Sequence, residues 1–600
     1  MSPEQNAPVL PLTDKIDVKS IDLAHHDESI AAESPEVENI TYTDEIHEPE
    51  LHARTWIALT ALCVQSFCQL FSLMGPPSLL GQIAADLNGV ESQTWVPNSM
   101  LLVQAVFCGI LSSASDLFQA RKALLVTCTT IAFIGSAIAP GSQSIGRLIA
   151  AQTLIGASIA VITLTFVVPS EILPTKWRPM AQAAINVAGG LGMISAPLIM
   201  GALAKRNLQT GWRTFYWIEM ALWGASAVFL FIGYRPPKRH TRFDHLSTWQ
   251  KLKQLDLLGA LIIATGLVLL LTGLNLGGTL YPWASAPTLV TLILGFVGLI
   301  GFGIFEWKGT KRGIVNHELF THNKKLVRTF IICVWLMFVE GAMVYSYIIF
   351  YPVLTQALFE TDLVVSSARV SVYFGGLAVG TPIFGYVGVK LRSIRETLTV
   401  GHIICLVGTI GMSTIQPGQN ARSLVFVALS GFGTAAVLSQ AIAGVQLASP
   451  HRHVATATAV AVISRAVSSS SFTSMYSAVV ANKLGVYIPE YIANAVVAAG
   501  LPVESVPDII LALTGSRPEA VASVPGVTEA DINAGVQGLQ QAYADGLRYP
   551  FIIACPFIFL AAVASWFITD LKAIMNYHVD APVEKLNAKG GHDEKIVDSV

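Results

Sequence analysis

The sequence predicts an all-α polytopic membrane protein with fourteen transmembrane helices. Fourteen apolar runs, most of them about twenty residues long, lie between Trp56 and Ile568. A run of this length spans the hydrocarbon core of a bilayer as a helix, which satisfies its own backbone hydrogen bonds there. Hydrophobic residues make up 53% of the chain and charged residues 13%, which excludes a string of soluble domains.

The lysine and arginine residues indicate which loops face the cytoplasm. With the N-terminus inside, about 27 of the 37 Lys and Arg residues lie on the cytoplasmic side and about 9 lie outside, as the positive-inside rule requires. An even number of spans returns the C-terminus to the same side. We therefore expect an integral multi-pass protein with both termini in the cytoplasm, located in the plasma membrane.

An acidic tail, residues 1–53, precedes the first apolar run. The first 50 residues hold thirteen Asp or Glu residues against two Lys and contain no aromatic residue except Tyr42, which is typical of a disordered segment. The tail lacks the basic start and apolar core of a signal peptide. The six runs that follow have approximate bounds 56–80, 96–115, 124–138, 145–168, 183–202 and 215–234.

A basic loop, residues 235–253, separates these runs from the remaining eight. Their approximate bounds are 257–276, 289–305, 329–350, 370–387, 400–415, 424–445, 454–480 and 551–568. The proline-containing segment 481–548 is expected outside the cell, with short helices around 489–499 and 529–547. Residues 571–600 form a cytoplasmic tail.

Two familiar motifs are absent or incomplete. No G-x-x-x-x-G-K-[ST] occurs, so a nucleotide-driven pump in a single chain is disfavoured, and active transport would use an ion gradient. The string H-E-L-F-T-H, from His317 to His322, resembles a zinc-hydrolase signature, but its second His is one residue too far on and about 140° away on a helix. We expect no metal, no cofactor and no enzymatic activity.

The fifth run contains a ridge of small residues that lets a neighbouring helix approach closely. The ridge consists of Ala184, Ala188, Gly192 and Ala196. Pro197 then interrupts the backbone hydrogen bonds. From Gly192 to Gly201, G-M-I-S-A-P-L-I-M-G resembles the antiporter signature G-x-x-x-G-P-x-x-G-G of the major facilitator superfamily, with Ala196 and Met200 at two glycine positions. A tightly packed, kinked helix without a transport role is the alternative.

The loop after the second run reads S-D-L-F-Q-A-R-K, where that superfamily carries S-D-x-F-G-R-R. Asp116 and the cationic pair Arg121 and Lys122 match, whereas Gln119 and Ala120 replace the usual glycine and first arginine. An Asp at a helix end can accept a hydrogen bond from a neighbouring helix N-terminus or an Arg, and so hold one conformation of a gate. A plain interfacial anchor is the alternative.

Further stretches extend the resemblance over about residues 55–570. L-D-L-L-G at 255–259 and L-N-L-G-G at 274–278 are similar to fourteen-span drug/proton antiporters. E-I-L-P-T-K-W-R at 171–178 and Q-A-Y at 541–543 resemble the fungal trichothecene-efflux-pump-like branch.

This resemblance implies a major facilitator fold. It places one six-helix bundle in residues 54–235 and a second in residues 326–570, with a cytoplasmic linker and the seventh and eighth runs inserted in residues 236–325. Substrate would bind at the midplane between the bundles, which rock to expose it to each side in turn.

Two ionisable residues within the apolar runs are the leading site candidates, because a charge at this depth costs several kcal/mol unless it faces a cavity or a partner. Glu340 lies near the middle of the ninth run among aromatic residues that include Tyr345. It could carry a proton beside a wall suited to an amphipathic molecule, or it could simply pair with a polar neighbour. Arg465, in the thirteenth run, is more readily an ion-pair anchor than a proton carrier.

Polar residues of the first half are weaker candidates. Gln104, Gln152 and Asn186 could each hydrogen-bond a ligand or only a neighbouring helix. Gln152 occupies the position where the family's fourth-span pattern R-x-x-Q-G has a proton-coupling arginine, and the first run has no acidic residue. These departures shift the expected proton coupling toward Glu340.

The resemblance implies a monomeric secondary transporter that exports a hydrophobic or amphipathic small organic molecule in exchange for protons. A toxin, a secondary metabolite or a drug would fit, and no nucleic acid partner is expected. Proton-coupled uptake of a siderophore or another organic solute is an alternative. A non-transporting membrane sensor that signals through its tails is a third interpretation.

Overall fold

The structure is a computed structural model that describes residues 41–93, 95–207, 210–237, 247–252, 255–277, 281–309, 318–321, 323–360, 362–514 and 527–589. Within these ranges every named element is a helix, and strand-like pairing is limited to three isolated bridges. The prediction of an all-α protein is therefore confirmed.

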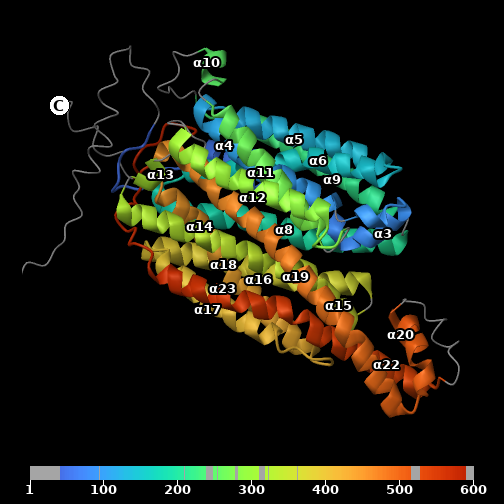
Figure 1. Ribbon diagram of the computed structural model, residues 1–600. Coiled ribbons are helices and arrows are strands. Elements are labelled where there is room, and N and C mark those ends of the chain that lie inside the picture. The colour runs from blue at the N-terminus through green and yellow to red at the C-terminus, as the bar shows by residue number, and fades with distance from the viewer. Residues whose placement is uncertain are drawn as a thin grey trace, which may run out of the picture.

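The first six apolar runs form long helices that pack together on one side of the molecule (Figure 1). The fourth run is divided in two at Val161, whose backbone departs from helical geometry. The helices of this N-terminal half are α2 (Ala53–Met74), α3 (Leu80–Asp86), α4 (Trp95–Phe118), α5 (Arg121–Ile138), α6 (Ile145–Ala160), α7 (Ile162–Ile172), α8 (Arg178–Arg206) and α9 (Gly211–Gly233).

The last six runs form the C-terminal half in the same manner. A π-helical turn, η6 (Ser346–Phe350), divides the ninth run just before Pro352, which has no N–H to continue the regular hydrogen bonding. The helices are α14 (Lys324–Tyr345), α15 (Tyr351–Leu358), α16 (Leu363–Leu391), α17 (Arg395–Met412), α18 (Asn420–Leu447), α19 (Val454–Ala499), α20 (Val506–Thr514), α22 (Glu529–Leu547) and α23 (Tyr549–Trp566).

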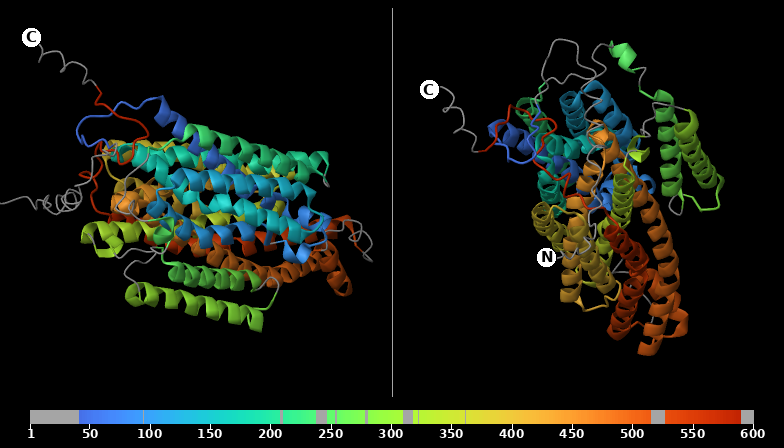
Figure 2. Two further views of the ribbon diagram at one scale, coloured as in Figure 1. Left: turned by 90° about the horizontal axis from the view of Figure 1, so that it is seen from above. Right: turned by 90° about the vertical axis from the view of Figure 1, so that its left-hand side faces the viewer.

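The two halves meet chiefly where α8 packs on α16 and where α4 packs on α19. The seventh and eighth runs form α11 (Leu257–Leu276) and α12 (Ala286–Ile304), which stand at the side of the two halves (Figure 2). Helix α11 contacts both α4 and α19, and α12 packs mainly on α11. The linker around this pair holds two short helices, α10 (Thr248–Leu252) and α13 (Glu318–Thr321). The inserted pair therefore lies along the seam between the halves.

Twelve helical segments in the described part of the chain are long and apolar enough to cross a membrane. The eleventh and thirteenth apolar runs form helices as well, α17 and α19, but these two are not among the twelve. The exact count of fourteen spans therefore stays a prediction.

The segment expected as an outer loop, 481–548, contains the short helix predicted at 529–547, which is α22, but differs from the prediction at 489–499. Helix α19 continues without interruption to Ala499 and includes Pro489, which the sequence suggested as the start of a separate short helix. Helix α22 packs along this extension, and a Cβ at Gly538 would lie 2.7 Å from the carbonyl oxygen of Tyr491. Tertiary packing thus offsets the local cost of the proline. Figure 1 shows α20 and α22 projecting beyond the end of the bundle.

Both described ends of the chain lie at the opposite end of the bundle, called here the termini end. Antiparallel bridges join Tyr42 to Val579 and Pro49 to Ala588. The carboxylate of Glu584 accepts hydrogen bonds from the backbone N–H of His52, just before α2, and from the hydroxyl of Thr55 in the first turn of α2 at 2.6 Å. Residues 41–52, expected within a disordered tail, are therefore packed on the C-terminal segment, residues 571–589. Residues 1–40 lie outside the described ranges.

Close packing of α8 on α2 depends on Gly192. A Cβ at this position would lie 2.5 Å from the carbonyl oxygen of Phe67 on α2, whereas a Cβ at Gly190 would have its nearest neighbour at 3.8 Å. We expect Gly192→Ala to lower stability by about 1–3 kcal/mol through overpacking and Gly190→Ala to have little effect. Thermal unfolding of the purified variants would check this, and equal midpoints for the two variants would contradict it.

Candidate functional site

Arg121 lies at the centre of a buried network at the termini end. Its guanidinium donates to Glu171 through Nε (2.7 Å) and Nη2 (2.5 Å), to Asp116 (3.0 Å) and to the hydroxyl of Ser115 (2.8 Å). The side chains of Arg121, Asp116 and Glu171 are no more than 12% exposed. One cation thus holds two carboxylates from different helices in a fixed arrangement.

The structure brings only part of the gate-like motif together. Asp116 and Arg121 form an ion pair, but the ammonium of Lys122 lies 5.0 Å over the ring of Phe231, away from the network. Glu171 was not among the predicted site residues, although it opens a string that resembles the family.

The replacement of the motif's usual glycine by Gln119 has a visible backbone consequence. Gln119 has a φ of 51°, a left-handed conformation that favours glycine. Its side-chain amide donates to the carbonyl oxygen of Asp116 at 2.9 Å. This local hydrogen bond offsets part of the strain and keeps the tight turn that leads into α5.

Polar contacts join the two halves at the termini end. The second carboxylate oxygen of Asp116 accepts from the backbone N–H (3.2 Å) and hydroxyl (3.1 Å) of Thr456 at the start of α19. The hydroxyl of Ser170 donates to the side-chain oxygen of Gln446 on α18 at 2.6 Å, and Gln182 donates to the same oxygen at 3.2 Å. The halves cannot separate at this end unless these bonds break.

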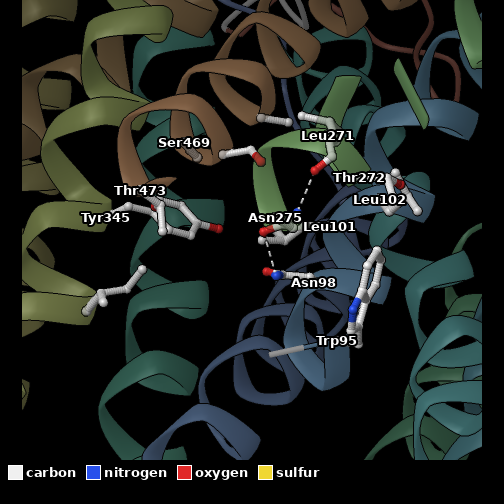
Figure 3. Close-up of a pocket in the computed structure, with 13 residues that line it drawn as sticks. Trp95, Asn98, Leu101, Leu102, Leu271, Thr272, Asn275, Tyr345, Ser469 and Thr473 are labelled. Carbon is white, nitrogen blue, oxygen red and sulfur yellow. Dashed lines mark hydrogen bonds between the residues drawn. The ribbon is translucent and has the colours of Figure 1, made fainter. Parts of the chain in front are cut away.

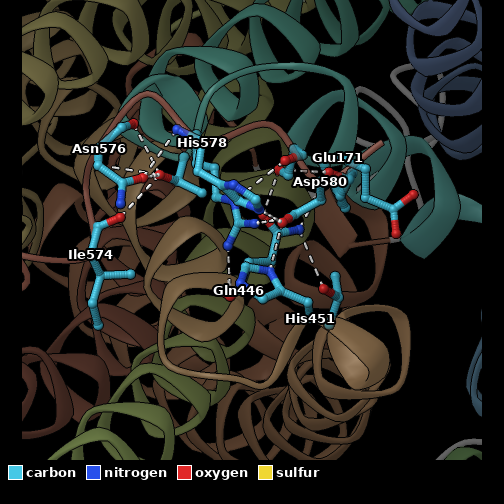
Figure 4. A network of polar contacts seen from close by, with 12 residues as sticks. Glu171, Gln446, His451, Ile574, Asn576, His578 and Asp580 are labelled. Atoms are coloured by element: carbon cyan, nitrogen blue, oxygen red, sulfur yellow. Dashed lines mark hydrogen bonds and ion pairs between the residues drawn. The ribbon is translucent and has the colours of Figure 1, made fainter. Parts of the chain in front are cut away.

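Asp580, from the C-terminal segment, adds a further ion pair at this end (Figure 4). Its carboxylate lies 2.6 Å from Nη2 of Arg178, at the start of α8, and close to the imidazoles of His451 and His578. Burial by itself raises the pKa of Asp580, but the hydrogen bonds from both histidines and the charge of Arg178 outweigh it and hold that pKa well below its usual range. Asp580 is therefore a stable anion.

Glu340 and Arg465, predicted separately, form an ion pair between α14 and α19. Nε of Arg465 lies 3.1 Å from Oε2 of Glu340, whose side chain is 1% exposed, against 17% for Arg465. A Cβ on the adjacent Gly341 would lie 2.5 Å from the carbonyl oxygen of Arg465, so the glycine allows this close approach. Neither carboxylate oxygen of Glu340 accepts a hydrogen bond from the described residues.

A small pocket lies beside this pair, between α4, α11, α14 and α19 (Figure 3). The amide of Asn98 donates to the side-chain oxygen of Asn275 at 2.7 Å and so ties α4 to the inserted helix α11. Tyr345, a predicted candidate, points toward these two residues, and Ser469 and Thr473 of α19 complete the polar part of the lining. The pocket therefore opens on both halves and on the inserted pair.

The predicted polar candidates of the first half lie apart from this pocket. Gln152 is buried and donates to the hydroxyl of Tyr216 within the first half. Asn186 donates to the carbonyl oxygen of Leu438 on α18 at 3.1 Å, so it contributes to the contact between the halves. Gln104 is half-buried on α4.

The antiporter-like residues lie on α8, which packs on α2 of its own half and on α16 of the other half. Ala196, Pro197 and Gly201 are buried there, as is Gly192. The histidines of the H-E-L-F-T-H string, His317 and His322, lie outside the described residues.

Glu219 is another buried acid and was not among the predicted site residues. It lies on α9 with 1% exposure, and its Oε1 accepts long hydrogen bonds from Ser136 (3.4 Å) and Trp223 (3.3 Å). No hydrogen bond reaches its Oε2 within the described part of the chain. The signal was present in the sequence, because Glu219 stands inside the sixth apolar run.

The comparisons with known proteins agree with this architecture. A family model described as "Fungal trichothecene efflux pump (TRI12)" matches residues 16–597. The chain belongs to this family. Efflux pump apf11 of Gibberella fujikuroi is 26% identical over 439 residues, which are 72% of this chain and 76% of that protein. An uncharacterized transporter of Schizosaccharomyces pombe is 26% identical over 530 residues, 86% of this chain and 81% of the relative.

Among solved structures, this member of the trichothecene efflux pump family is similar to the proton:xylose symporter XylE, bound to 6-bromo-6-deoxy-D-glucose. The superposition covers 87% of this chain. The match includes 99% of the symporter chain, with a TM-score of 0.50 and 11% identity, and bears on the fold alone. The expected major facilitator fold is thus confirmed. The protein is a multi-pass membrane transporter of a fungal efflux pump family.

Proposed function

We propose that this transporter exports hydrophobic or amphipathic small organic molecules, such as toxins, secondary metabolites or drugs, in exchange for protons. Glu340 is the proton carrier, and the pocket lined by Asn98, Asn275 and Tyr345 is part of the substrate path. In this arrangement the protein works as a monomer in the plasma membrane with the termini end in the cytoplasm.

The buried pair of Glu340 and Arg465 is the observation that carries the proposal. The charge of Glu340 is stabilised by Arg465, while neither of its carboxylate oxygens accepts a hydrogen bond from the described residues. Protonation neutralises the carboxylate and removes most of the attraction to the guanidinium. A proton taken up on one side of the membrane can therefore loosen the contact of α14 with α19 at the edge of the pocket.

The contacts between the halves support alternating access. Asp116 with Thr456, and Ser170 with Gln446, hold the halves together at the termini end. Opening that end to the cytoplasm requires these bonds to break. The pocket lies between the halves and is lined in part by residues of α14 and α19. Proton binding at Glu340 would bias the choice between the two arrangements.

Transport by purified protein in vesicles, with and without an imposed pH gradient, tests the proposal. A panel of toxic amphipathic compounds serves as substrates, chosen by a sensitivity screen in a transport-deficient fungal host. We expect extrusion that is driven by an inwardly directed proton gradient and lost when the gradient is collapsed. Transport that ignores the gradient would contradict antiport, and gradient-driven accumulation, for example of a siderophore, would reverse the direction.

A further inference from the structure

The C-terminal segment, residues 571–589, is attached to the N-terminal half by its backbone. The N–H groups of Thr175 and Lys176, in the loop before α8, donate to the carbonyl oxygens of His578 (3.0 Å) and Asn576 (2.8 Å). The ammonium of Lys176 also lies 4.4 Å over the ring of Tyr577. The segment is therefore held in a fixed path across the termini end.

The same segment reaches the C-terminal half through Asp580. One oxygen of this carboxylate pairs with Arg178 of the N-terminal half (2.6 Å). The other oxygen lies 2.9 Å from Nδ1 of His451, in the turn between α18 and α19, and 3.1 Å from Nε2 of His578 (Figure 4). Three parts of the chain thus converge on one carboxylate.

We propose that His451, His578 and Asp580 form a binding site for a divalent transition-metal ion, and that Zn²⁺ is the ion whose preferences they match. Two imidazole nitrogens and one carboxylate oxygen lie within 4.8 Å of one another. Three protein ligands of this kind with further positions for water are typical of zinc sites. The H-E-L-F-T-H string plays no part in this site.

The distances from Asp580 to the two histidines are close to those that a bound ion requires. Tetrahedral ligands at roughly 2.0–2.1 Å from Zn²⁺ lie about 3.4 Å apart, so the histidines need to withdraw from Asp580 by only a few tenths of an ångström. Arg178 holds the other carboxylate oxygen and so orients the ligand, as outer hydrogen bonds do in metal sites. The side chain of His451 is 55% exposed, which leaves an entry path from solvent.

The bound ion would lock the termini end. His451 belongs to the C-terminal half, whereas Asp580 is tied to the N-terminal half by Arg178 and by the backbone of its segment. Coordination replaces hydrogen bonds by stronger bonds across this junction and so favours the conformation in which the halves touch there. Zn²⁺ would act as an inhibitor that arrests the transport cycle.

Isothermal titration of the full-length protein with Zn²⁺, purified through a tag that contains no histidine, tests the site. We expect one saturable site per chain, and a thermal unfolding midpoint that rises with Zn²⁺ and falls back with chelator. His451→Ala, His578→Ala and Asp580→Asn should each weaken binding at least tenfold. His47→Ala is the matched control, because His47 pairs with Asp44 at 2.8 Å at the exposed surface without belonging to the cluster.

X-ray absorption by the Zn²⁺-loaded wild type needs no variant and guards against misfolding of the substituted proteins. We expect nitrogen and oxygen ligands with an imidazole signature of two histidines. Absence of saturable binding, unchanged binding in all three variants, or a sulfur-dominated signature from the cysteines would each overturn the proposal. In the first two cases the histidines serve only as hydrogen-bond donors to Asp580.

Discussion

Replacement of Glu340 by Gln is expected to abolish the dependence of transport on the proton gradient while the protein still reaches the membrane. The amide keeps the shape of the carboxyl and leaves an oxygen beside the guanidinium of Arg465, but it cannot take up or release a proton. Substrate flux in vesicles, measured at several imposed pH gradients, should therefore become independent of the gradient.

Two further variants test whether the loss of coupling is due to the missing proton site at Glu340. Glu219→Gln removes a buried acid inside the sixth apolar run of the other half and should leave coupling intact, so the opposite pattern would move the proton carrier to α9. Glu340→Leu leaves the Arg465 cation without its partner and should lower stability by about 3–5 kcal/mol, as for other broken buried pairs. Coupled transport that persists in Glu340→Gln would remove Glu340 from the mechanism.

Loss of Arg121 should damage the protein much more than loss of the neighbouring cation Lys122. In Arg121→Ala the buried carboxylates of Asp116 and Glu171 face each other without a counter-ion. We expect a loss of about 3–5 kcal/mol in the free energy of unfolding, seen as a much lower thermal midpoint in detergent and a low yield of folded protein. Adding Glu171→Gln should restore part of the loss, because one uncompensated charge is removed.

Lys122→Ala is the matched control for Arg121. Its ammonium lies over the ring of Phe231 and outside the network, so its removal should change the midpoint little. If Arg121→Ala and Lys122→Ala had the same midpoint, the network would not hold this end of the protein together.

Hydropathy and loop charge were sufficient to predict the fold class, because each apolar run carries its own signal for a membrane helix. The family was also recognisable, since short strings such as those before α5 and in α8 keep their order along the chain. The uninterrupted helix α19 was not predictable in this way. Pro489 is a local signal to end a helix, and only the packing of α22 on the extension overrides it.

The candidate site was predicted only in part, because residue type and depth do not reveal partners. Glu340 and Arg465 were both chosen as charges within apolar runs, but their pairing depends on how α14 packs on α19. Glu171 lies 50 positions from Arg121 in the sequence, and no local pattern links them. Glu219 carried the same signal as Glu340 and was overlooked. The roles of all these residues stay predictions.

Arg178 also sets an order of events during synthesis. Its carboxylate partner, Asp580, lies 402 positions further along the chain, beyond the last helix of the C-terminal half. A growing chain must therefore complete its N-terminal half and insert every later helix before this contact can form. Only a chain that extends to Asp580 can form this ion pair, so shorter products would lack it, although Arg178 would still donate to the carbonyl oxygens of Ser170 and Gln446.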